Sequence, residues 1–345
     1  MHLLGLPLVL LSGLVGWLVA WLILRNAARL GLVQPVNERS SHVVPTPTGG
    51  GLGIAFGGTL AGLPLLLVLP LAAATALIAG LVIAVIGFAD DRKSLSIRLR
   101  LGAQALCFGL VVASLPLDGF AYATGLIWPD AILLVVLVLA GIGFINIFNF
   151  MDGIDGLAAG EAIFILLGAG ALIVLANPAL LGHPVLWWML GVAAATLGFL
   201  VFNWPPAKLF MGDAGSTYLG LMLAIFAFLT IAASWLTGPQ WLLLAAAFIA
   251  DASATLLRRL WQRERIFEAH RRHAYQQLAT RLGRHAPVTL GYLALNLVVL
   301  WPLAWLAGQL PAWGTPIALA ALAVLIGLAW GLGAGAPSQA IKDRK

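Results

Sequence analysis

The sequence predicts an all-α, polytopic integral membrane protein with about eleven transmembrane helices in one domain, residues 1–345. Hydrophobic residues make up 61% of the chain and charged residues 9%, whereas a soluble domain is about 25% charged. The apolar residues form continuous runs near the ~20 residues that cross a bilayer, without the alternation of a β-barrel strand. This composition excludes a cytosolic enzyme, a nucleic-acid-binding domain and a disordered protein.

The expected spans follow one another along the whole chain. They cover residues 3–24, 50–69, 71–89, 101–116, 131–150, 157–176, 185–202, 216–235, 240–257, 289–308 and 317–334. Arg25 and Arg29 follow the first span and no basic segment precedes it, which is the opposite charge order to a cleaved signal peptide. We therefore expect the first span to be retained. The only cysteine, Cys107, cannot form an intramolecular disulfide, and we expect it to pack in the core.

The connectors between spans divide into two sets by charge. One set holds all 19 Lys and Arg residues and comprises residues 25–49, 90–100, 151–156, 203–215, 258–288 and the tail 335–345. The other set holds none. By the positive-inside rule the basic set is cytoplasmic, which places the N-terminus in the periplasm and the C-terminus in the cytoplasm. Tryptophans such as Trp128 and Trp313 lie near the outer ends, as in an interfacial aromatic belt.

Five aspartates lie at the cytoplasmic ends of the spans, where ionisable residues are costly and commonly functional. They are Asp90, Asp91, Asp152, Asp155 and Asp213. Each alone could be a helix cap, but five beside glycines on one face favour a shared site. Their carboxylates suit Mg²⁺, which prefers one or two protein carboxylates together with substrate phosphates.

Connector 258–288 carries eight arginines and the segment His270-Arg271-Arg272-His273. Three interpretations stay open: an anchor on anionic headgroups, a two-histidine metal site, or a phosphate site in which arginine binds oxygen pairs. The glycine run 49–51 could offer N–H groups to an anion, or form a turn. Together these features indicate Mg²⁺, a phosphorylated soluble donor and an acceptor within the membrane.

Several motifs occur in an order that is specific to one family. They are Arg39-Ser40-Ser41-His42 with residues 45–50, Asp90-Asp91, residues 146–156, Phe210-Met211-Gly212-Asp213, and His270-Arg271-Arg272-His273. From Arg39 to Gln276 the chain resembles the polyprenyl-phosphate N-acetylhexosamine-1-phosphate transferases of glycosyltransferase family 4, which include the MraY and WecA enzymes. The resemblance implies transfer of a sugar-1-phosphate from a UDP-N-acetylhexosamine to undecaprenyl phosphate, with release of UMP and with Mg²⁺, or Mn²⁺ as a substitute.

The resemblance also implies roles for individual residues. Asp213, Asp91 and Asp155 match metal positions. Asp90, as the base for the lipid phosphate, Asp91, His270 and His273 match catalytic positions. The positions expected to hold the nucleotide donor are Asn149, Asp152, Asp155, Arg271, Arg272, Arg39 and Lys93. A covalent aspartyl intermediate stays open as the alternative to a base.

One departure bears on the subfamily. The muramoyl-pentapeptide transferases carry three adjacent histidines where this chain has His270-Arg271-Arg272-His273, a form that resembles the WbpL-type transferases that initiate O-antigen synthesis. The resemblance then implies UDP-N-acetylfucosamine or UDP-N-acetylquinovosamine as donor. The alternatives are a WecA-like UDP-N-acetylglucosamine transferase, a transporter and an inactive scaffold for polysaccharide assembly.

The expected partners are undecaprenyl phosphate, the UDP-sugar and the lipid bilayer, and no nucleic acid. A homodimer stays open beside the monomer. The expected location is the bacterial cytoplasmic (inner) membrane, with the active site on the cytoplasmic face.

Overall fold

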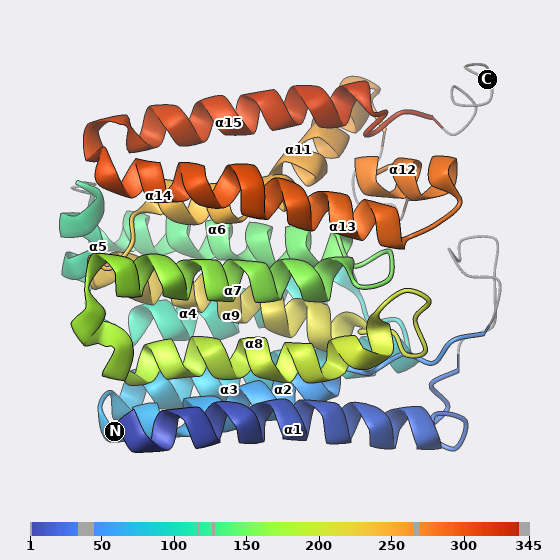
Figure 1. The fold of residues 1–345 in the computed structure, drawn as a ribbon, viewed down its shortest axis with the longest axis horizontal. Helices are drawn as coiled ribbons and strands as arrows, with labels where there is room; N and C mark the ends of the chain where they lie inside the picture. Colours follow the sequence, from blue (N-terminus) through green and yellow to red (C-terminus); the bar gives the residue numbers. More distant parts are fainter. Residues whose placement is uncertain (1, 34–44, 116, 126–127, 265–269, 338–345) are drawn as a thin grey trace.

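A computed structural model describes residues 2–33, 45–115, 117–125, 128–264 and 270–337. Within these residues the secondary structure is helical, apart from one isolated bridge between Val33 and Pro47. The long helices lie side by side along the long axis of the molecule (Figure 1). In chain order the elements are α1 (His2–Asn26), α2 (Gly51–Gly62), η1 (Leu63–Leu67), α3 (Pro70–Arg92), α4 (Ile97–Ala113), α5 (Leu117–Thr124), α6 (Asp130–Phe150), α7 (Leu157–Ala176), η2 (Pro178–Gly182), α8 (Pro184–Asn203), α9 (Asp213–Ala232), α10 (Gly238–Leu244), α11 (Ala246–Trp261), α12 (Ala274–Leu282), α13 (Ala286–Leu295), the π-helix η3 (Asn296–Leu300), α14 (Trp301–Gln309) and α15 (Pro311–Gly331).

The all-helical, polytopic membrane class is confirmed. Among the described residues, eight helices are long and apolar enough to cross a membrane, and the bent pair α10–α11 makes nine. The two other expected spans, 50–69 and 101–116, coincide with shorter helices, α2 with η1 and α4. The count of eleven spans and their orientation stay predictions.

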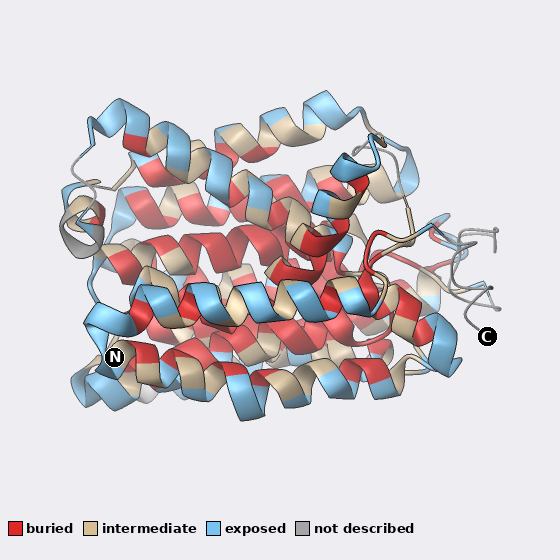
Figure 2. Ribbon diagram, turned by 90° about the horizontal axis from the view of Figure 1, so that it is seen from above, coloured by how far each residue is buried: buried red, intermediate tan, exposed pale blue. Residues whose placement is uncertain are grey.

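Helix α9 lies at the centre of the bundle. In its most apolar window 89% of the residues are buried, against 22% for α1, α6 and α15. It packs against α2, α3, α5 and α6, and Figure 2 shows the buried residues concentrated in the interior helices, with exposed residues on the outer ones. Because α9 begins at Asp213, the fold fixes this aspartate where the core meets one end of the bundle.

The expected span 240–257 corresponds to two helices with a break between them. Helices α10 and α11 meet at a bend of 76°, and Ala245 is the break between them. The run of apolar residues contains no proline or glycine at this point, so its composition gave no signal for a break. Beyond the bend α11 is amphipathic and carries Asp251 on a buried face. The Asp251 carboxylate of α11 accepts hydrogen bonds from the N–H groups of Ala274 and Tyr275 at the start of α12.

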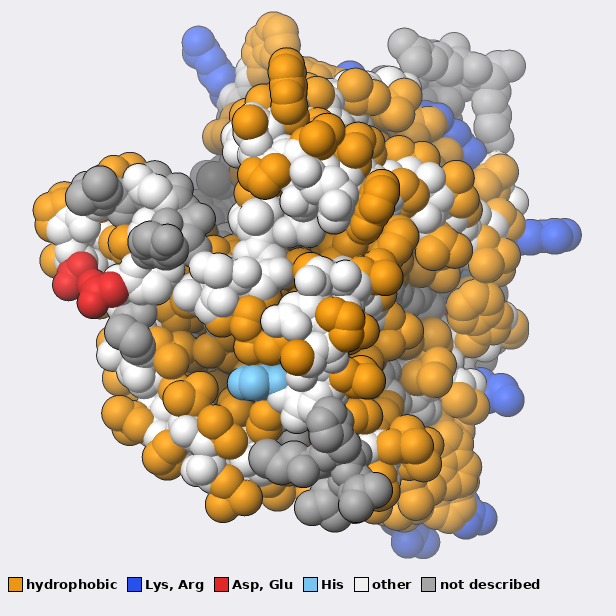
Figure 3. Space-filling model, turned by 60° about the vertical axis from the view of Figure 1, so that its left-hand side comes forward, with side chains coloured by type: hydrophobic (Ala, Val, Ile, Leu, Met, Phe, Trp, Pro, Cys, Tyr) orange, Lys and Arg blue, Asp and Glu red, His pale blue; other side chains and the backbone are white. Residues whose placement is uncertain are grey.

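Polar connectors gather at one end of the bundle. The connectors after α6 and α8 lie at the same end as α12 and the C-terminus, whereas the N-terminus and α5 lie at the opposite end (Figure 1). Turned to bring that opposite end forward, the molecule shows a mostly apolar surface with one acidic patch and with basic side chains only at the edges of the view (Figure 3). The charge asymmetry of the sequence is therefore also an asymmetry of the folded molecule.

Candidate active site

The loop before α9 is held by the start of α2. Phe210 donates its N–H to the Pro47 carbonyl at 2.8 Å, and the N–H groups of Gly50 and Gly51 donate to Phe210 and Met211 at 3.0 and 2.9 Å. These two glycine N–H groups are therefore satisfied by backbone carbonyls. The interpretation of this run as an anion cradle is not supported at Gly50 and Gly51, and the run instead supports the loop that ends at Asp213.

Asp91 fixes the N-terminus of α9. Its carboxylate accepts hydrogen bonds from the N–H groups of Asp213 at 2.9 Å and Ala214 at 3.3 Å. Two of the unpaired N–H groups of α9 are thereby satisfied by a negative charge at the positive end of the helix dipole. Gly212 precedes them with φ of 72°, and a Cβ there would collide with the Asp91 carboxylate and with Thr48 Oγ1. Only glycine fits this turn.

Arg100 joins two of the predicted aspartates. Its Nη1 lies 2.7 Å from Asp90 Oδ2 and 3.4 Å from Asp213 Oδ2. On the other side of Asp213, the Asn149 amide donates to Oδ1 at 2.8 Å and to the Ser216 hydroxyl at 2.8 Å. The structure therefore brings together Asp90, Asp91, Asn149 and Asp213, which come from three helices.

Sequence reasoning did not select Arg100 for the site. It was counted only as one of the basic residues that set the orientation. Its place near the start of α4, ten residues after Asp90, was the available signal, because the short turn between α3 and α4 returns it to the aspartates.

The loop 151–156 presents Asp152 and Asp155 in different surroundings. Burial, together with the nearby carboxylates of Asp213, Asp91 and Asp155, raises the pKa of Asp152 to about 8. Asp155 Oδ2 accepts from the Ala207 N–H at 3.0 Å and lies 3.2 Å from His285 Nδ1. Asp152 thus faces the carboxylate cluster, while Asp155 joins its loop to the loop after α8 and to the start of α13.

The histidine segment lies against the end of α6. The rings of His270 and His273 are 5.0 Å apart, and the His273 ring stacks on Tyr275 at 5.6 Å. The Tyr275 hydroxyl donates to the Phe150 carbonyl at 3.0 Å. Burial and the charges of His273, Arg259 and Arg272 lower the pKa of His270 to about 4. His270 is therefore neutral at physiological pH.

Several arginines of connector 258–288 pair with other groups of the protein itself. Arg272 Nη1 donates to Glu264 at 2.6 and 2.8 Å, and this pairing with Arg272 holds the pKa of Glu264 below its usual value. Arg259 Nε contacts the same carboxylate at 3.2 Å. Arg258 donates to the Ala334 carbonyl at 2.7 Å and lies over the Trp330 ring. Part of the basic charge therefore fixes this connector to the segment after α15.

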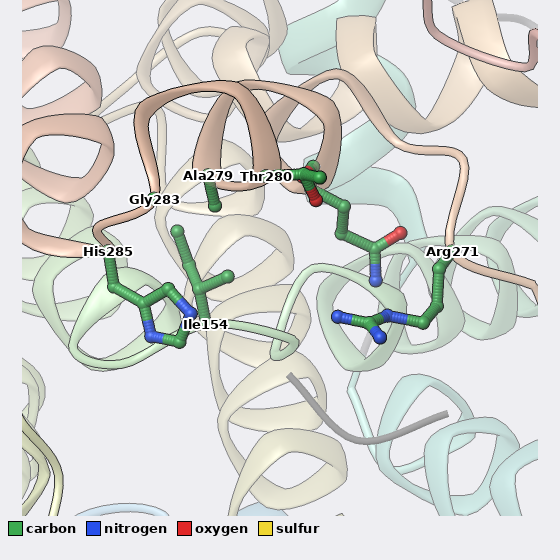
Figure 4. A pocket seen from close by; sticks show the side chains of 7 residues that line it. Ile154, Arg271, Ala279, Thr280, Gly283 and His285 are labelled. Atoms are coloured by element: carbon green, nitrogen blue, oxygen red, sulfur yellow. The ribbon is translucent and has the colours of Figure 1, made fainter. Parts of the chain in front are cut away.

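A polar cavity of about 180 Å³ separates the loop 151–156 from α12. Arg271 extends toward it from the segment before α12, and His285 reaches it from the residue before α13 (Figure 4). This volume is more than ten times the roughly 10–15 Å³ of cavity that one water molecule requires. It is lined by Ile154, Arg271, Gln276, Ala279, Thr280, Gly283 and His285.

Lys93 and Arg39 are the remaining predicted donor residues. Lys93 is the exposed residue that ends α3. Arg39 falls outside the described residues. Cys107, expected in the core, is buried.

The carboxylates of the site could supply only some of the ligands of a metal ion. No group of three or more His, Cys, Asp or Glu side chains with metal-binding geometry occurs in the described part of the chain. Mg²⁺ in phosphoryl-transfer sites commonly takes one or two carboxylates and completes its shell with phosphates and water. A cluster in which burial, together with the neighbouring carboxylates, raises the pKa of Asp152 fits such an ion, because a bound cation favours the charged form.

Comparison with known proteins agrees with this geometry. The sequence profile of glycosyl transferase family 4 matches residues 73–232, the stretch from α3 through α9. A probable undecaprenyl-phosphate N-acetylglucosaminyl 1-phosphate transferase of Bacillus subtilis is 31% identical over 286 residues, which cover 78% of this chain and 76% of that protein. The chain belongs to glycosyl transferase family 4.

Other family-4 members are similarly related to the chain. A decaprenyl-phosphate N-acetylglucosaminephosphotransferase of Mycobacterium leprae is 32% identical over 84% of this chain and 77% of its own length. A phospho-N-acetylmuramoyl-pentapeptide-transferase of Synechococcus is 33% identical over 75% of this chain and 74% of its own. The matches thus include family-4 enzymes whose names give different sugars.

Proposed function

We propose that this family-4 protein transfers a sugar-1-phosphate from a UDP-N-acetylhexosamine to undecaprenyl phosphate. The observation that carries the proposal is the convergence of Asp90, Asp213 and Arg100 at one end of an apolar bundle, in a chain whose relatives are named for polyprenyl phosphate and a sugar phosphate. A lipid phosphate oxygen attacks the β-phosphorus of the donor. The bond between that phosphorus and the oxygen of UMP breaks, giving an undecaprenyl-diphosphate sugar and UMP.

Asp90 is placed to accept the proton of the lipid phosphate. Its side chain is 8% exposed and lies 2.7 Å from Arg100. A phosphate monoester loses its second proton near pH 6, so a carboxylate is a sufficient base to remove it. Arg100 holds Asp90 beside Asp213 and supplies positive charge where the acceptor phosphate would approach.

Asp213 and Asp152 are the residues we propose to hold Mg²⁺, for which Mn²⁺ would substitute. When bound, the ion supplies charge neutralisation of the donor diphosphate and of the leaving UMP. Asp91 and Asp155 also matched metal positions. Asp91 is hydrogen bonded to the start of α9 and Asp155 contacts Ala207 and His285, so we propose that both orient the ligands.

The donor is proposed to lie between the loop 151–156 and the segment 270–276. Ile154 and Arg271 line the cavity between them, and we propose that Asn149 and Asp155 on one side and the two histidines on the other complete the donor site. Because His270 is neutral near pH 7, it would act as a hydrogen-bond donor to the sugar or a phosphate. Arg271 would carry the charge, and the Arg272–Glu264 pair would keep the segment in place.

The sugar is proposed to be N-acetylfucosamine or N-acetylquinovosamine, in the initiation of O-antigen or another surface polysaccharide. Support comes from His270-Arg271-Arg272-His273, which differs from the three adjacent histidines of the muramoyl-pentapeptide enzymes. Placement in the inner membrane with a cytoplasmic site is supported by the basic connectors at the site end. A transporter is disfavoured because transporters place substrate groups near the midplane, whereas these carboxylates gather at one end.

A donor panel tests the proposal. Purified protein is mixed with undecaprenyl phosphate, Mg²⁺ and UDP-N-acetylfucosamine, UDP-N-acetylquinovosamine or UDP-N-acetylglucosamine, and the lipid product is identified by mass. We expect UMP release with the first two donors. Preference for UDP-N-acetylglucosamine would overturn the assignment of the sugar, and no release with any donor would overturn the reaction.

A further inference from the structure

Asp251 is a buried carboxylate that the proposed chemistry does not use. It lies on α11 beyond the bend and is 1% exposed. Its oxygens accept from the N–H groups of Ala274 at 2.7 Å and Tyr275 at 3.0 Å, and from the Tyr292 hydroxyl at 2.8 Å. Oδ1 also lies 3.5 Å from His273 Nδ1.

These contacts concentrate on the histidine segment. A carboxylate buried in an apolar helix costs several kcal/mol unless donors surround it. Three of the four partners named above come from residues 273–275, where α12 begins. Asp251 therefore satisfies the first N–H groups of α12 and places a negative charge at the positive end of that helix.

The same segment is fixed from its other side to the carboxylate cluster. Tyr275 donates to the last carbonyl of α6, Phe150, and a Cβ on Gly153 would collide with the Tyr275 hydroxyl. The segment is thus held between Asp251 of α11 and the loop that carries Asp152. Moving its start by about 1 Å would shift both histidines relative to that loop.

We propose that Asp251 is a positioning residue for donor binding. It fixes the start of α12 and faces Nδ1 of His273, which leaves Nε2 as the nitrogen for a ligand. The proposal rests on the proposed function only for the identity of the ligand, a UDP-sugar. The positioning role also gives the 76° bend between α10 and α11 a function, because α11 in line with α10 would place Asp251 farther from α12.

The test uses Asp251→Asn with Glu161→Gln as matched control. Glu161 is another fully buried carboxylate, 0% exposed, but it is hydrogen bonded to Asn296 of η3 and not to the described residues of the segment 270–276. We expect Asp251→Asn to raise KM for the UDP-sugar roughly 10- to 100-fold, with KM for undecaprenyl phosphate unchanged. The control should leave both KM values unchanged. A loss confined to kcat, or an equal rise for both substrates, would overturn the proposal.

A second readout does not depend on turnover. In wild-type protein and both variants, hydrogen–deuterium exchange is followed at the amides of Ala274 and Tyr275. Asp251→Asn should speed their exchange. The carboxylate accepts from both N–H groups, whereas asparagine has one accepting oxygen and an –NH₂ group that can only donate. Glu161→Gln should leave the exchange unchanged. Unchanged exchange would overturn the positioning role even in an active enzyme. Faster exchange in a protein whose wild type releases no UMP would uphold it and refute the proposed reaction.

Should Asp251→Asn fail to fold, Tyr292→Phe removes one donor and leaves the carboxylate in place. A rise of a few-fold in donor KM is then expected. Wild-type KM in that variant would overturn the proposal.

Discussion

Replacing Gly153 with alanine should displace the histidine segment from the site. A Cβ at this position would overlap the Tyr275 hydroxyl and would lie 3.0 Å from Tyr275 Cζ and from Gln276 Nε2. Tyr275 is fully buried, so its ring cannot swing into solvent. The hydroxyl must therefore leave the Phe150 carbonyl, its acceptor at 3.0 Å.

The cost has two parts. Loss of the hydrogen bond is worth about 1 kcal/mol, and overpacking at a buried ring costs about 1–3 kcal/mol. Gly153→Ala should therefore destabilise the protein by roughly 2–4 kcal/mol. Tyr275→Phe loses about 1 kcal/mol but removes the atom that collides. The double variant should then be more stable than the sum of the two changes by about 1 kcal/mol for the hydrogen bond that both single variants lose, and in addition by the part of the overpacking, about 1–3 kcal/mol, that loss of the hydroxyl relieves.

The assay is the unfolding temperature of the detergent-purified protein together with KM for the UDP-sugar. Gly143→Ala is the matched control, because Gly143 lies in α6, the helix that precedes the Gly153 loop, and a Cβ there meets nothing within 4 Å. The control should be neutral or slightly stabilising, since alanine favours a helix over glycine. Wild-type stability of Gly153→Ala, or strict additivity in the double variant, would refute the contact on which the reasoning depends.

Three further variants test the carboxylate cluster and the histidines. Arg100→Gln leaves the Asp90 and Asp213 carboxylates side by side without a cation, so UMP release should fall at least 100-fold. Arg98→Gln is the control at an exposed arginine. Full activity of Arg100→Gln would contradict the role of Arg100. Asp152→Asn in chelator should raise the unfolding temperature by an amount that grows from pH 4 to 8. The pKa of Asp152 in the native protein, about 8, lies above the ordinary 3.8, so the stability of the wild type falls as the pH rises over this range. A difference in unfolding temperature between variant and wild type that does not change with pH would contradict the raised pKa. His270→Asn should lower the rate but leave the shape of the pH–rate profile between pH 6 and 9 unchanged, because a pKa of about 4 keeps the ring neutral there; a lost limb in that profile would show that His270 titrates.

Much of the fold followed from local sequence. Apolar runs give helices wherever backbone groups must be satisfied in hydrocarbon, so most expected spans lie within two or three residues of a helix, α7 and α8 among them. The bend at Ala245 could not be predicted, because no residue at the break disfavours a helix. It accompanies the burial of Asp251 against α12, which is a tertiary contact.

The site was predictable to the extent that its residues sit in motifs. Asp90, Asp91, Asn149 and Asp213 were selected and lie together. Arg100 and Asp251 were not selected, because each lies within an expected span or at its edge. Each also has a partner more than twenty residues away, Asp213 for Arg100 and Ala274 for Asp251, which the local sequence does not indicate. The backbone N–H groups bound by the Asp91 carboxylate likewise cannot be read from a sequence.

The most direct measurement compares UMP release by wild-type protein and by Asp213→Asn. Both are supplied with the accepted UDP-sugar and undecaprenyl phosphate, with and without Mg²⁺. We expect release only from the wild type with Mg²⁺ present, and an unchanged unfolding temperature in the variant. Release by Asp213→Asn at the wild-type rate, or release that continues in chelator, would contradict the assignment of this carboxylate cluster as the active site.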